Sequence, residues 1–467
     1  MPVQRSKGGF FIGVGCPGCG AELELEQNFF VLTCTHCGSP LRIIRPDAPP
    51  AYLVRSKLAH HEVRFHVDRY LRKHGLPLTG SGVAGKALYY PYWDVHALVL
   101  KKRNRLVERY VAGDGWDSTD DRSYRQERTE VFLAPYDVTV PAGYPVDGIP
   151  PSLGLRTGYL KAMPFASENI ETDFDALPVL VPWTEMVENV KRKVRTIGSI
   201  NQADFGRNRT DLLTLTGSVV YFPFHLLESY SAGQYYRLVV DGVTGRICSH
   251  AAFPQSPDER FEIDTPTIEF GQLTVEFHRC RNCGEDLPSE QSYVYICRNC
   301  REVTCLGQLP VEIEQIRAVM TDTEIPGDQL FPFWSLSLNE QVTSQGRRLS
   351  RSPHHTDRIV IPAFRITNFE AFYRLSKRIS AAVSRFSLTT LDSPEHRLMP
   401  VSVSPSEAAA LARAVVFRDE IGSNSYRGDT DLRVDQLDLF YAPFHPEHYF
   451  YVDSVLGAVT FEKSAVA

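Results

Sequence analysis

The spacing of apolar residues along the chain predicts three helices. In two segments, 185–195 and 369–386, apolar residues recur at intervals that place them on one face of a helix. These residues are Met186, Val190 and Val194 in the first segment and Phe372, Leu375, Ile379 and Val383 in the second. A third helix is predicted over about 52–74, where six basic and two acidic residues give a net charge of +4. We interpret this basic helix first as a solvated surface and second as a docking site for anionic lipid or nucleic acid.

Strands are predicted in two pairs of segments with related sequences. The segments 89–93 and 330–334 read Tyr-Tyr-Pro-Tyr-Trp and Leu-Phe-Pro-Phe-Trp, where the aromatic residues favour a strand and the proline favours a sheet edge. The segments 221–247 and 441–459 each contain Pro-Phe-His and then an aspartate-led turn with a glycine between apolar runs. That pattern is typical of a β-hairpin. A basic hairpin tip is predicted at 101–105.

Eight of the ten cysteines form two groups with the spacing of tetrahedral metal sites. In each group one Cys-x2-Cys pair is followed, after 14 or 13 residues, by a second pair. The predicted ligands are Cys16, Cys19, Cys34 and Cys37 in the first group and Cys280, Cys283, Cys297 and Cys300 in the second. Each two-residue gap lets one turn direct two thiolates at a cation, and four sulfurs leave no position for water or substrate. The prediction is two structural Zn²⁺ ions, for which His36 and His278 are not needed as ligands.

The cysteine spacing also allows two other readings. Rubredoxin-like iron is held by similar turns, and disulfides are disfavoured by a reducing cytosol. The flanking residues are typical of ribbons, because strands are predicted at 30–33 and 293–296, before the second turn of each group. Glycine, which tolerates a left-handed backbone, follows three of the four turns, at Gly20, Gly38 and Gly284. Arg301 takes the equivalent place after the fourth turn.

These elements occur twice in the same order, which predicts an internal duplication. Each half carries a cysteine group, a Pro-aromatic-Trp strand, a helix and a Pro-Phe-His hairpin. The hairpins share Pro223, Phe224, His225, Val240, Asp241, Val243, Gly245 and Ile247 in the first copy and Pro443, Phe444, His445, Val452, Asp453, Val455, Gly457 and Val459 in the second. The predicted fold class is α+β, with two zinc ribbons that are each followed by a β-rich module with short helices. The predicted boundaries are 1–45 for the first ribbon, 46–78 for the basic helix and linker, 79–270 for the first β-rich module, 271–308 for the second ribbon and 309–467 for the second β-rich module.

The composition is that of a soluble globular chain with more than one domain. The 467 residues are 43% hydrophobic and 23% charged, and 31 of them are prolines. We find no signal-peptide core and no run of about 18 apolar residues, so the predicted location is the cytoplasm, without a transmembrane segment. The formal net charge of -6 disfavours a general duplex-binding protein, because phosphate affinity comes mostly from Lys and Arg.

No catalytic or cofactor-binding set is predicted. The glycines and lysine at 80–86 resemble a phosphate loop, but a strand is predicted directly after them, where such a loop needs a helix. His61 and His66 are one residue too far apart to act as paired metal ligands on a helix. Four further polar residues are interpreted as structural, namely His225, His445, Asp241 and Asp453. A pocket that joined the two histidines would instead indicate an enzyme assembled between the halves.

The chain resembles a group of bacterial proteins that contain transcription-factor-B-type zinc ribbons. The resemblance rests on Pro332, Phe333, Trp334, Asp241, Gly242, Thr244 and Gly245. Some members of that group are encoded beside SPFH-domain or phage-shock membrane-stress proteins, so the resemblance implies a scaffold at the periphery of a membrane complex. The chain departs from the group at His225 and His445, where the group has tryptophan.

The predicted function is therefore a non-enzymatic, zinc-binding scaffold or adaptor that assembles with protein partners. The closed metal groups, the repeated hairpins and the lack of a catalytic set favour this prediction. The alternative is a nucleic-acid-binding accessory protein that uses the ribbons and the helix at 52–74, although the acidic net charge disfavours it.

Overall fold

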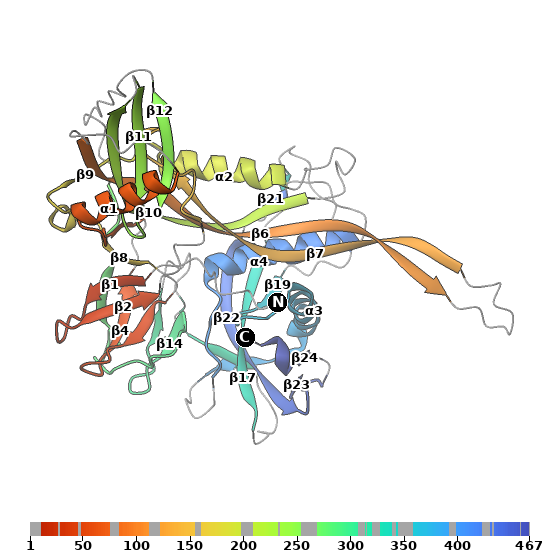
Figure 1. The fold of residues 1–467 in the computed structure, drawn as a ribbon. Helices are drawn as coiled ribbons and strands as arrows, with labels where there is room; N and C mark the ends of the chain where they lie inside the picture. Colours follow the sequence, from red (N-terminus) through yellow and green to blue (C-terminus); the bar gives the residue numbers. More distant parts are fainter. Residues whose placement is uncertain are drawn as a thin grey trace.

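The computed structural model shows an α+β fold that is rich in strands (Figure 1). It describes residues 11–26, 29–44, 48–74, 84–111, 122–154, 160–197, 209–231, 234–253, 269–306, 313, 315–319, 327–338, 342–343, 358–391, 398–422, 430–431, 434–457 and 459–466. The α-helices in this part of the chain are α1 (His60–Lys73), α2 (Trp183–Ile197), α3 (Phe369–Ala382) and α4 (Pro405–Gly422). Helices α2 and α3 confirm the helices predicted at 185–195 and 369–386.

The larger sheet has ten strands and includes the strands of the first β-rich module. Its main path runs β12-β11-β10-β5-β8-β1-β2, and β6 pairs with β10, β7 and β9. The strands are β1 (Phe11–Gly15), β2 (Glu22–Glu26), β5 (Ala51–Val54), β6 (Ala84–Val111), β7 (Arg122–Pro141), β8 (Lys161–Pro164), β9 (Phe174–Ala176), β10 (Arg209–Ser231), β11 (Gln234–Asp241) and β12 (Ile247–Phe253). Because β1 pairs in parallel with β8, the first ribbon is joined to this sheet.

The second sheet has seven strands and contains the second β-rich module. Its path runs β19-β17-β22-β16-β20, and β23 pairs with β22 and β24. The strands are β16 (Arg317–Val319), β17 (Gln329–Leu338), β19 (Arg358–Pro362), β20 (Leu388–Thr390), β22 (Val434–Glu447), β23 (Phe450–Asp453) and β24 (Thr460–Glu462). The smaller sheets pair β3 (Val31–Thr33), β4 (Pro40–Ile44) and β13 (Thr274–Phe277), then β14 (Val294–Ile296) with β15 (Val303–Cys305), and β18 (Val342–Thr343) with β21 (Thr430–Asp431).

The two large sheets contain matching strand registers. Pro91 lies opposite Tyr221 where β6 pairs with β10, and Pro332 lies opposite Tyr441 where β17 pairs with β22. In both sheets the second of these strands continues into a hairpin, β10 with β11 and β22 with β23. Both predicted Pro-aromatic-Trp strands and both predicted Pro-Phe-His hairpins are therefore confirmed. Their predicted place at a sheet edge is wrong, because β6 lies between β10 and β7 and β17 lies between β19 and β22.

The tryptophan of each Pro-aromatic-Trp strand makes the same contact. The indole N–H of Trp93 donates to the carbonyl of Val181 at 2.8 Å, and the indole N–H of Trp334 donates to the carbonyl of Val403 at 2.9 Å. Both side chains are buried. Each acceptor lies two residues before α2 or α4, so the tryptophan fixes the segment that leads into a helix.

Asp241 and Asp453 each cap the turn that they begin, as predicted. Oδ1 of Asp241 accepts hydrogen bonds from the backbone N–H groups two and three residues further on, at 2.8 and 2.9 Å. Oδ1 of Asp453 accepts the equivalent bonds at 3.2 and 2.6 Å. Gly245 and Gly457 close these turns with φ of 70° and 60°. Residues with a Cβ atom rarely adopt this left-handed conformation.

The prediction of a helix over 52–74 is wrong in its first part. Residues Ala51–Val54 are strand β5, which is buried between β10 and β8, and α1 begins only at His60. A short apolar segment forms a strand here because it pairs with a strand on each side. The order of apolar residues in so short a segment does not distinguish a strand from a helix. Helix α1 contains four basic and two acidic residues, so its net charge is +2.

Helix α4 corresponds in position to α2, whereas the predicted duplication paired 185–195 with 369–386. Helix α2 lies in the chain between β8 and β10, and α4 lies between the equivalent strands β20 and β22. The sequence pattern did not predict α4, because its apolar residues face several directions. The helix lies against β10 of the first module as well as β17 and β19 of the second, and most of its described residues are buried or half-buried, so it has no polar face of ordinary width.

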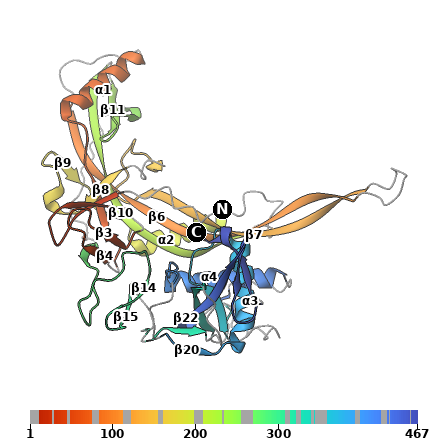
Figure 2. The ribbon, with the colours of Figure 1, turned by 90° about the horizontal axis from the view of Figure 1, so that it is seen from below.

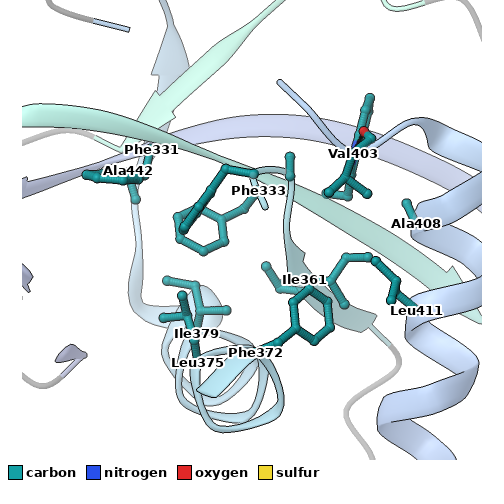
Figure 3. Packing of buried hydrophobic residues seen from close by; sticks show 14 of the residues in the cluster. Phe331, Phe333, Ile361, Phe372, Leu375, Ile379, Val403, Ala408, Leu411 and Ala442 are labelled. Carbon is teal, nitrogen blue, oxygen red and sulfur yellow. Dashed lines mark hydrogen bonds between the residues drawn. The ribbon is translucent and has the colours of Figure 1, made fainter. Parts of the chain in front are cut away.

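The core of the second module surrounds the Pro-aromatic-Trp strand (Figure 3). Phe331 and Phe333 are fully buried. Phe333 lies near Ile379 of α3, whereas Phe331 lies beside Ala442 and packs against Phe364 and Phe461. The same cluster includes Leu100 of β6. Strand β6 of the first module therefore packs into the core of the second, whereas the other buried residues of the first module form separate clusters. The sequence could not show this contact because it joins residues distant along the chain.

Strands β6 and β7 form a hairpin that extends far beyond the rest of the molecule (Figures 1 and 2). Strand β10 pairs with β6 as far as Lys102, whereas β7 pairs with β6 as far as Val111. We call the two-stranded part, 103–111 paired with 122–130, the arm. The prediction of a hairpin tip at 101–105 is wrong, because the strands continue past it.

Candidate metal centres

The predicted ligands meet in two groups of four sulfur atoms. The sulfurs of each group all lie within 4.8 Å of one another. The separations are 3.8 Å for Cys16–Cys37 and Cys19–Cys34, and 3.5 Å for Cys280–Cys300 and Cys283–Cys297. The structure therefore brings together all eight cysteines that the spacing predicted.

These separations fit a tetrahedral ion. Zinc–thiolate bonds of about 2.3 Å place four sulfurs at the corners of a tetrahedron whose edges are about 3.8 Å long. The sulfur–sulfur distances given above for the first group equal this edge length, and those for the second group are slightly shorter. Four sulfur donors suit Zn²⁺ and fill its coordination shell, so an ion here would contribute to folding and would not activate a substrate.

All four cysteine turns have the same backbone geometry. In each turn the N–H of the residue after the second cysteine donates to the carbonyl of the first, at 2.9 to 3.0 Å. That residue has a positive φ every time, with values of 73° at Gly20, 73° at Gly38, 77° at Gly284 and 66° at Arg301. The glycines are thus placed as predicted. Arg301 is the one non-glycine residue with a positive φ in the described part of the chain.

Local hydrogen bonds favour the thiolate form of two ligands. The side chain and backbone of Ser39 lower the pKa of Cys37 to about 6. The backbone N–H of Glu285 has the same effect on Cys283 and lowers its pKa to about 6. Burial instead raises the pKa of Cys297 to about 11. Since metals bind the thiolate, a cation is needed before all four sulfurs of the second group are ionised together at neutral pH.

The two ribbons pack against each other although they are far apart in the sequence. Strand β13, which leads into the second cysteine group, pairs with β4, which follows the first group. The side-chain amide of Gln291 hydrogen-bonds to both the N–H and the carbonyl of Val31. Phe30 stacks on Tyr293 with ring centroids 4.5 Å apart. Sequence reasoning missed this pairing, and no local pattern signals it.

A small core is shared by both ribbons. It consists of Val31 from the first ribbon and Cys280, Leu287, Tyr295 and Cys297 from the second. Two ligands of the second group thus lie against a strand of the first ribbon. The ribbon pair also contacts the second module, because Tyr293 N–H donates to the carbonyl of Val401 at 2.7 Å.

Neither histidine near the cysteine turns belongs to a sulfur group, in agreement with the prediction. His36 is exposed within its turn. His278 is fully buried between the ribbons, where its ring meets Tyr295 edge-on with centroids 4.5 Å apart. Burial lowers the pKa of His278 to about 4, so the ring is neutral in the folded protein.

The other candidate residues do not form a site. His225 packs against Phe174 in the first sheet, with ring centroids 5.3 Å apart, and His445 lies 3.0 Å from Asp328 in the second. The two histidines are thus not brought together in a pocket. Gly85 is part of strand β6, so the glycine-rich segment has no phosphate-loop geometry there, while 80–83 lie outside the described residues. On α1, His66 packs against the turn glycine Gly245, and no metal group includes it among the described residues.

One half-buried histidine that the sequence did not single out is held between two carboxylates. His96 Nε2 lies 3.0 Å from Asp94 Oδ2, and Nδ1 lies 2.9 Å from Asp137 Oδ1. Burial disfavours the imidazolium, but the hydrogen bonds and charges of the two aspartates outweigh it and raise the pKa of His96 to about 10. Because both ring nitrogens are engaged by the aspartates, we interpret the cluster as structural.

This histidine predicts a pH-dependent contribution to stability. Because the pKa is raised from 6.5 to about 10, the contribution is complete below pH 6.5 and is lost as the pH rises towards 10. We expect the difference in unfolding free energy between the natural protein and His96→Gln, measured in urea, to be largest near pH 6 and to shrink by pH 10. His448→Gln, which removes an exposed imidazole, is the control. A difference that grows with pH would contradict the assignment.

No known protein family, no curated protein and no solved structure matches the chain. Among the described residues, no helix is both long and apolar enough to cross a membrane.

Proposed function

We propose that the protein is a non-enzymatic scaffold in which two structural Zn²⁺ ions stabilise a ribbon pair between two β-rich modules, and in which the arm binds a protein partner. The observation that carries this proposal is the arm itself. In the described part of the chain, no third strand pairs with 103–111 or 122–130. Among the described residues, both edges of the arm are therefore open.

An open two-stranded arm is unfavourable unless something binds it. Isolated hairpins are at best marginally stable in water, because two strands bury little apolar surface. Their edges also present unpaired N–H and C=O groups, to which a strand of another protein can be added. The base of this hairpin is rigid, since Val99 and Leu100 are buried in the cores of the two modules. A stiff base and an unpartnered end are suited to an adaptor that holds its partner away from its own body.

We infer that the two ribbon-plus-module halves arose by internal duplication. The inference is supported by the matching registers of Pro91 and Pro332, by the equivalent hydrogen bonds of Trp93 and Trp334, and by the four identical cysteine turns. A duplication supplies two ribbons that can pair with each other. That pairing links the halves in the proposed scaffold.

Shortening the arm tests the proposed function. Arg103 lies opposite Glu130, so an Asn-Gly turn placed between them would close the hairpin at the edge of the body. We expect the shortened protein to keep its metal content and melting temperature but to lose partners that co-purify stoichiometrically from the native host. Cross-links in the natural protein should map to the arm. Tyr449→Ala, which removes an exposed aromatic side chain from the second module, is the control.

Two outcomes would count against the proposal, for different reasons. Equal recovery of a partner by the shortened protein would show that the arm is not the docking element. Recovery of the natural protein alone, under mild conditions and with the metal bound, would contradict the scaffold as a whole.

A further inference from the structure

The second ribbon carries three arginines at the tips of its cysteine turns. Both turns read Cys-Arg-Asn-Cys, which places Arg281 and Arg298 at equivalent positions, and Arg301 follows the second turn. All three side chains are exposed. Neighbouring Arg279 is paired with Asp286 at 2.8 Å, whereas none of these three forms an ion pair or hydrogen bond with another side chain in the described residues.

Arg301 has an unfavourable backbone conformation. Its φ of 66° lies in the left-handed region, where the Cβ atom of an L-residue crowds the backbone, and the other three turns have glycine at this position. Glycine would satisfy the turn without that cost. A strained residue in a place where the fold accepts glycine is a sign that its side chain is used.

The first ribbon shows that these arginines are not needed to fold a cysteine turn. Its turns contain Pro17, Gly18, Thr35 and His36 between the cysteines and no arginine, yet their backbone geometry is the same. Four thiolates around a divalent cation would carry the same negative charge in both ribbons, so charge screening does not explain arginines in only one of them. The difference between the ribbons therefore points to a ligand of the second.

We propose that the tip of the second ribbon binds the phosphate backbone of a nucleic acid through Arg281, Arg298 and Arg301. Guanidinium groups recognise phosphate with paired, charge-assisted hydrogen bonds. The strongly exposed large hydrophobic residues of the described chain are Ile44, Phe65, Phe132, Tyr449 and Phe450. None of them belongs to the second ribbon. The tip thus lacks the apolar anchor typical of a protein-binding surface.

The expected binding is local and sensitive to salt. Two exposed acids, Glu285 and Glu302, follow the two turns, and the whole chain has a net charge of -6. Three phosphate contacts release few counterions, so the affinity should fall about a hundredfold or less between 50 and 200 mM salt. The sequence-based alternative assigned nucleic-acid binding to both ribbons and the basic helix, whereas this site lies on the second ribbon alone, apart from α1, and does not depend on the arm.

The experiment uses the full-length, metal-loaded protein and a fluorescent 20-nucleotide single strand. A duplex of the same sequence is the second probe. Anisotropy at ~50 mM salt should detect binding, and the triple variant Arg281→Ala, Arg298→Ala, Arg301→Gly should weaken it at least tenfold. Arg374→Ala, which removes an exposed arginine from α3, should leave it unchanged. The metal content of each variant confirms that the ribbon is intact.

Arg301→Gly alone separates a binding role from a structural one. We expect it to weaken nucleic-acid binding severalfold and to raise the melting temperature, because glycine relieves the left-handed backbone. A lower melting temperature would show a structural role and overturn the inference. Undetectable binding at ~50 mM salt, unchanged binding by the triple variant, or equal displacement by polyglutamate would overturn it as well. The arm-shortened protein should still bind, so failure here is separate from failure of the proposed scaffold.

Discussion

Substitution of Cys297 by serine is expected to remove one of the two metal ions and to unfold the second ribbon. A serine hydroxyl is a poor replacement for a thiolate, and three remaining sulfurs hold a zinc ion far more weakly. The ribbon has little else to stabilise it, because among the described residues it contributes four buried members to this small core, Cys280, Leu287, Tyr295 and Cys297, with Cys300 and Leu306 partly buried against them. Structural zinc contributes about 10–16 kcal/mol to comparable small units, so no other single change in the ribbon should have a larger effect.

The same substitution should also weaken metal binding by the first ribbon. Val31 lies in the shared core, and β4 would lose its pairing with β13. A coupling of about 1–3 kcal/mol is typical of two sites joined through one interface, which corresponds to a 5- to 150-fold weaker affinity. Competition with a coloured chelator would measure this for the metal that remains. Gln291→Ala should reduce the coupling while both ions still bind, because it removes the amide that bridges the ribbons.

Elemental analysis decides between the metals and provides the control. We expect close to two zinc ions per natural chain, one in Cys297→Ser and two in Cys248→Ser, whose cysteine lies outside both groups. Iron, visible as a red colour, would contradict the assignment to zinc. Two ions retained by Cys297→Ser would contradict the ligand set, and an unchanged affinity of the remaining site would show that the ribbons bind independently.

The features that the sequence predicted correctly are those determined by neighbouring residues. A Cys-x2-Cys turn closes within five residues, so its spacing predicted the ligands and its glycines predicted the left-handed positions. Asp241 and Asp453 were interpreted correctly for the same reason, since each bonds to its own turn. The Cys-Arg-Asn-Cys repeat was equally visible, but the meaning of Arg301 required its φ.

The features that the sequence did not predict depend on contacts between distant segments. Strand β5 is a strand because β8 and β10 lie on either side of it. Helix α4 has no amphipathic pattern because both modules cover it. The pairing of β4 with β13 joins two ribbons whose sequences give no sign of it, and the length of the arm depends on where β10 stops pairing with β6. The fold class followed from local patterns, whereas the arrangement of the ribbons and modules did not.

Substitution of Trp334 by alanine should destabilise the protein by about 3–5 kcal/mol. The indole is fully buried, so its removal leaves a large cavity in the core. It also leaves the carbonyl of Val403 without its hydrogen bond, which adds a desolvation cost. Trp93→Ala should have an effect of similar size, because Trp93 makes the equivalent bond to Val181.

The pair of tryptophan variants also tests whether the two modules unfold together. Leu100 of the first module lies in the core of the second, and α4 contacts β10, so both substitutions should lower the midpoint of a single transition. Circular dichroism in urea measures this without relying on tryptophan fluorescence. Phe450→Ala, which removes a side chain that is 45% exposed, should change the midpoint little. Two separate transitions, each shifted by only one of the tryptophan variants, would show that the contacts of Leu100 and α4 do not couple the modules.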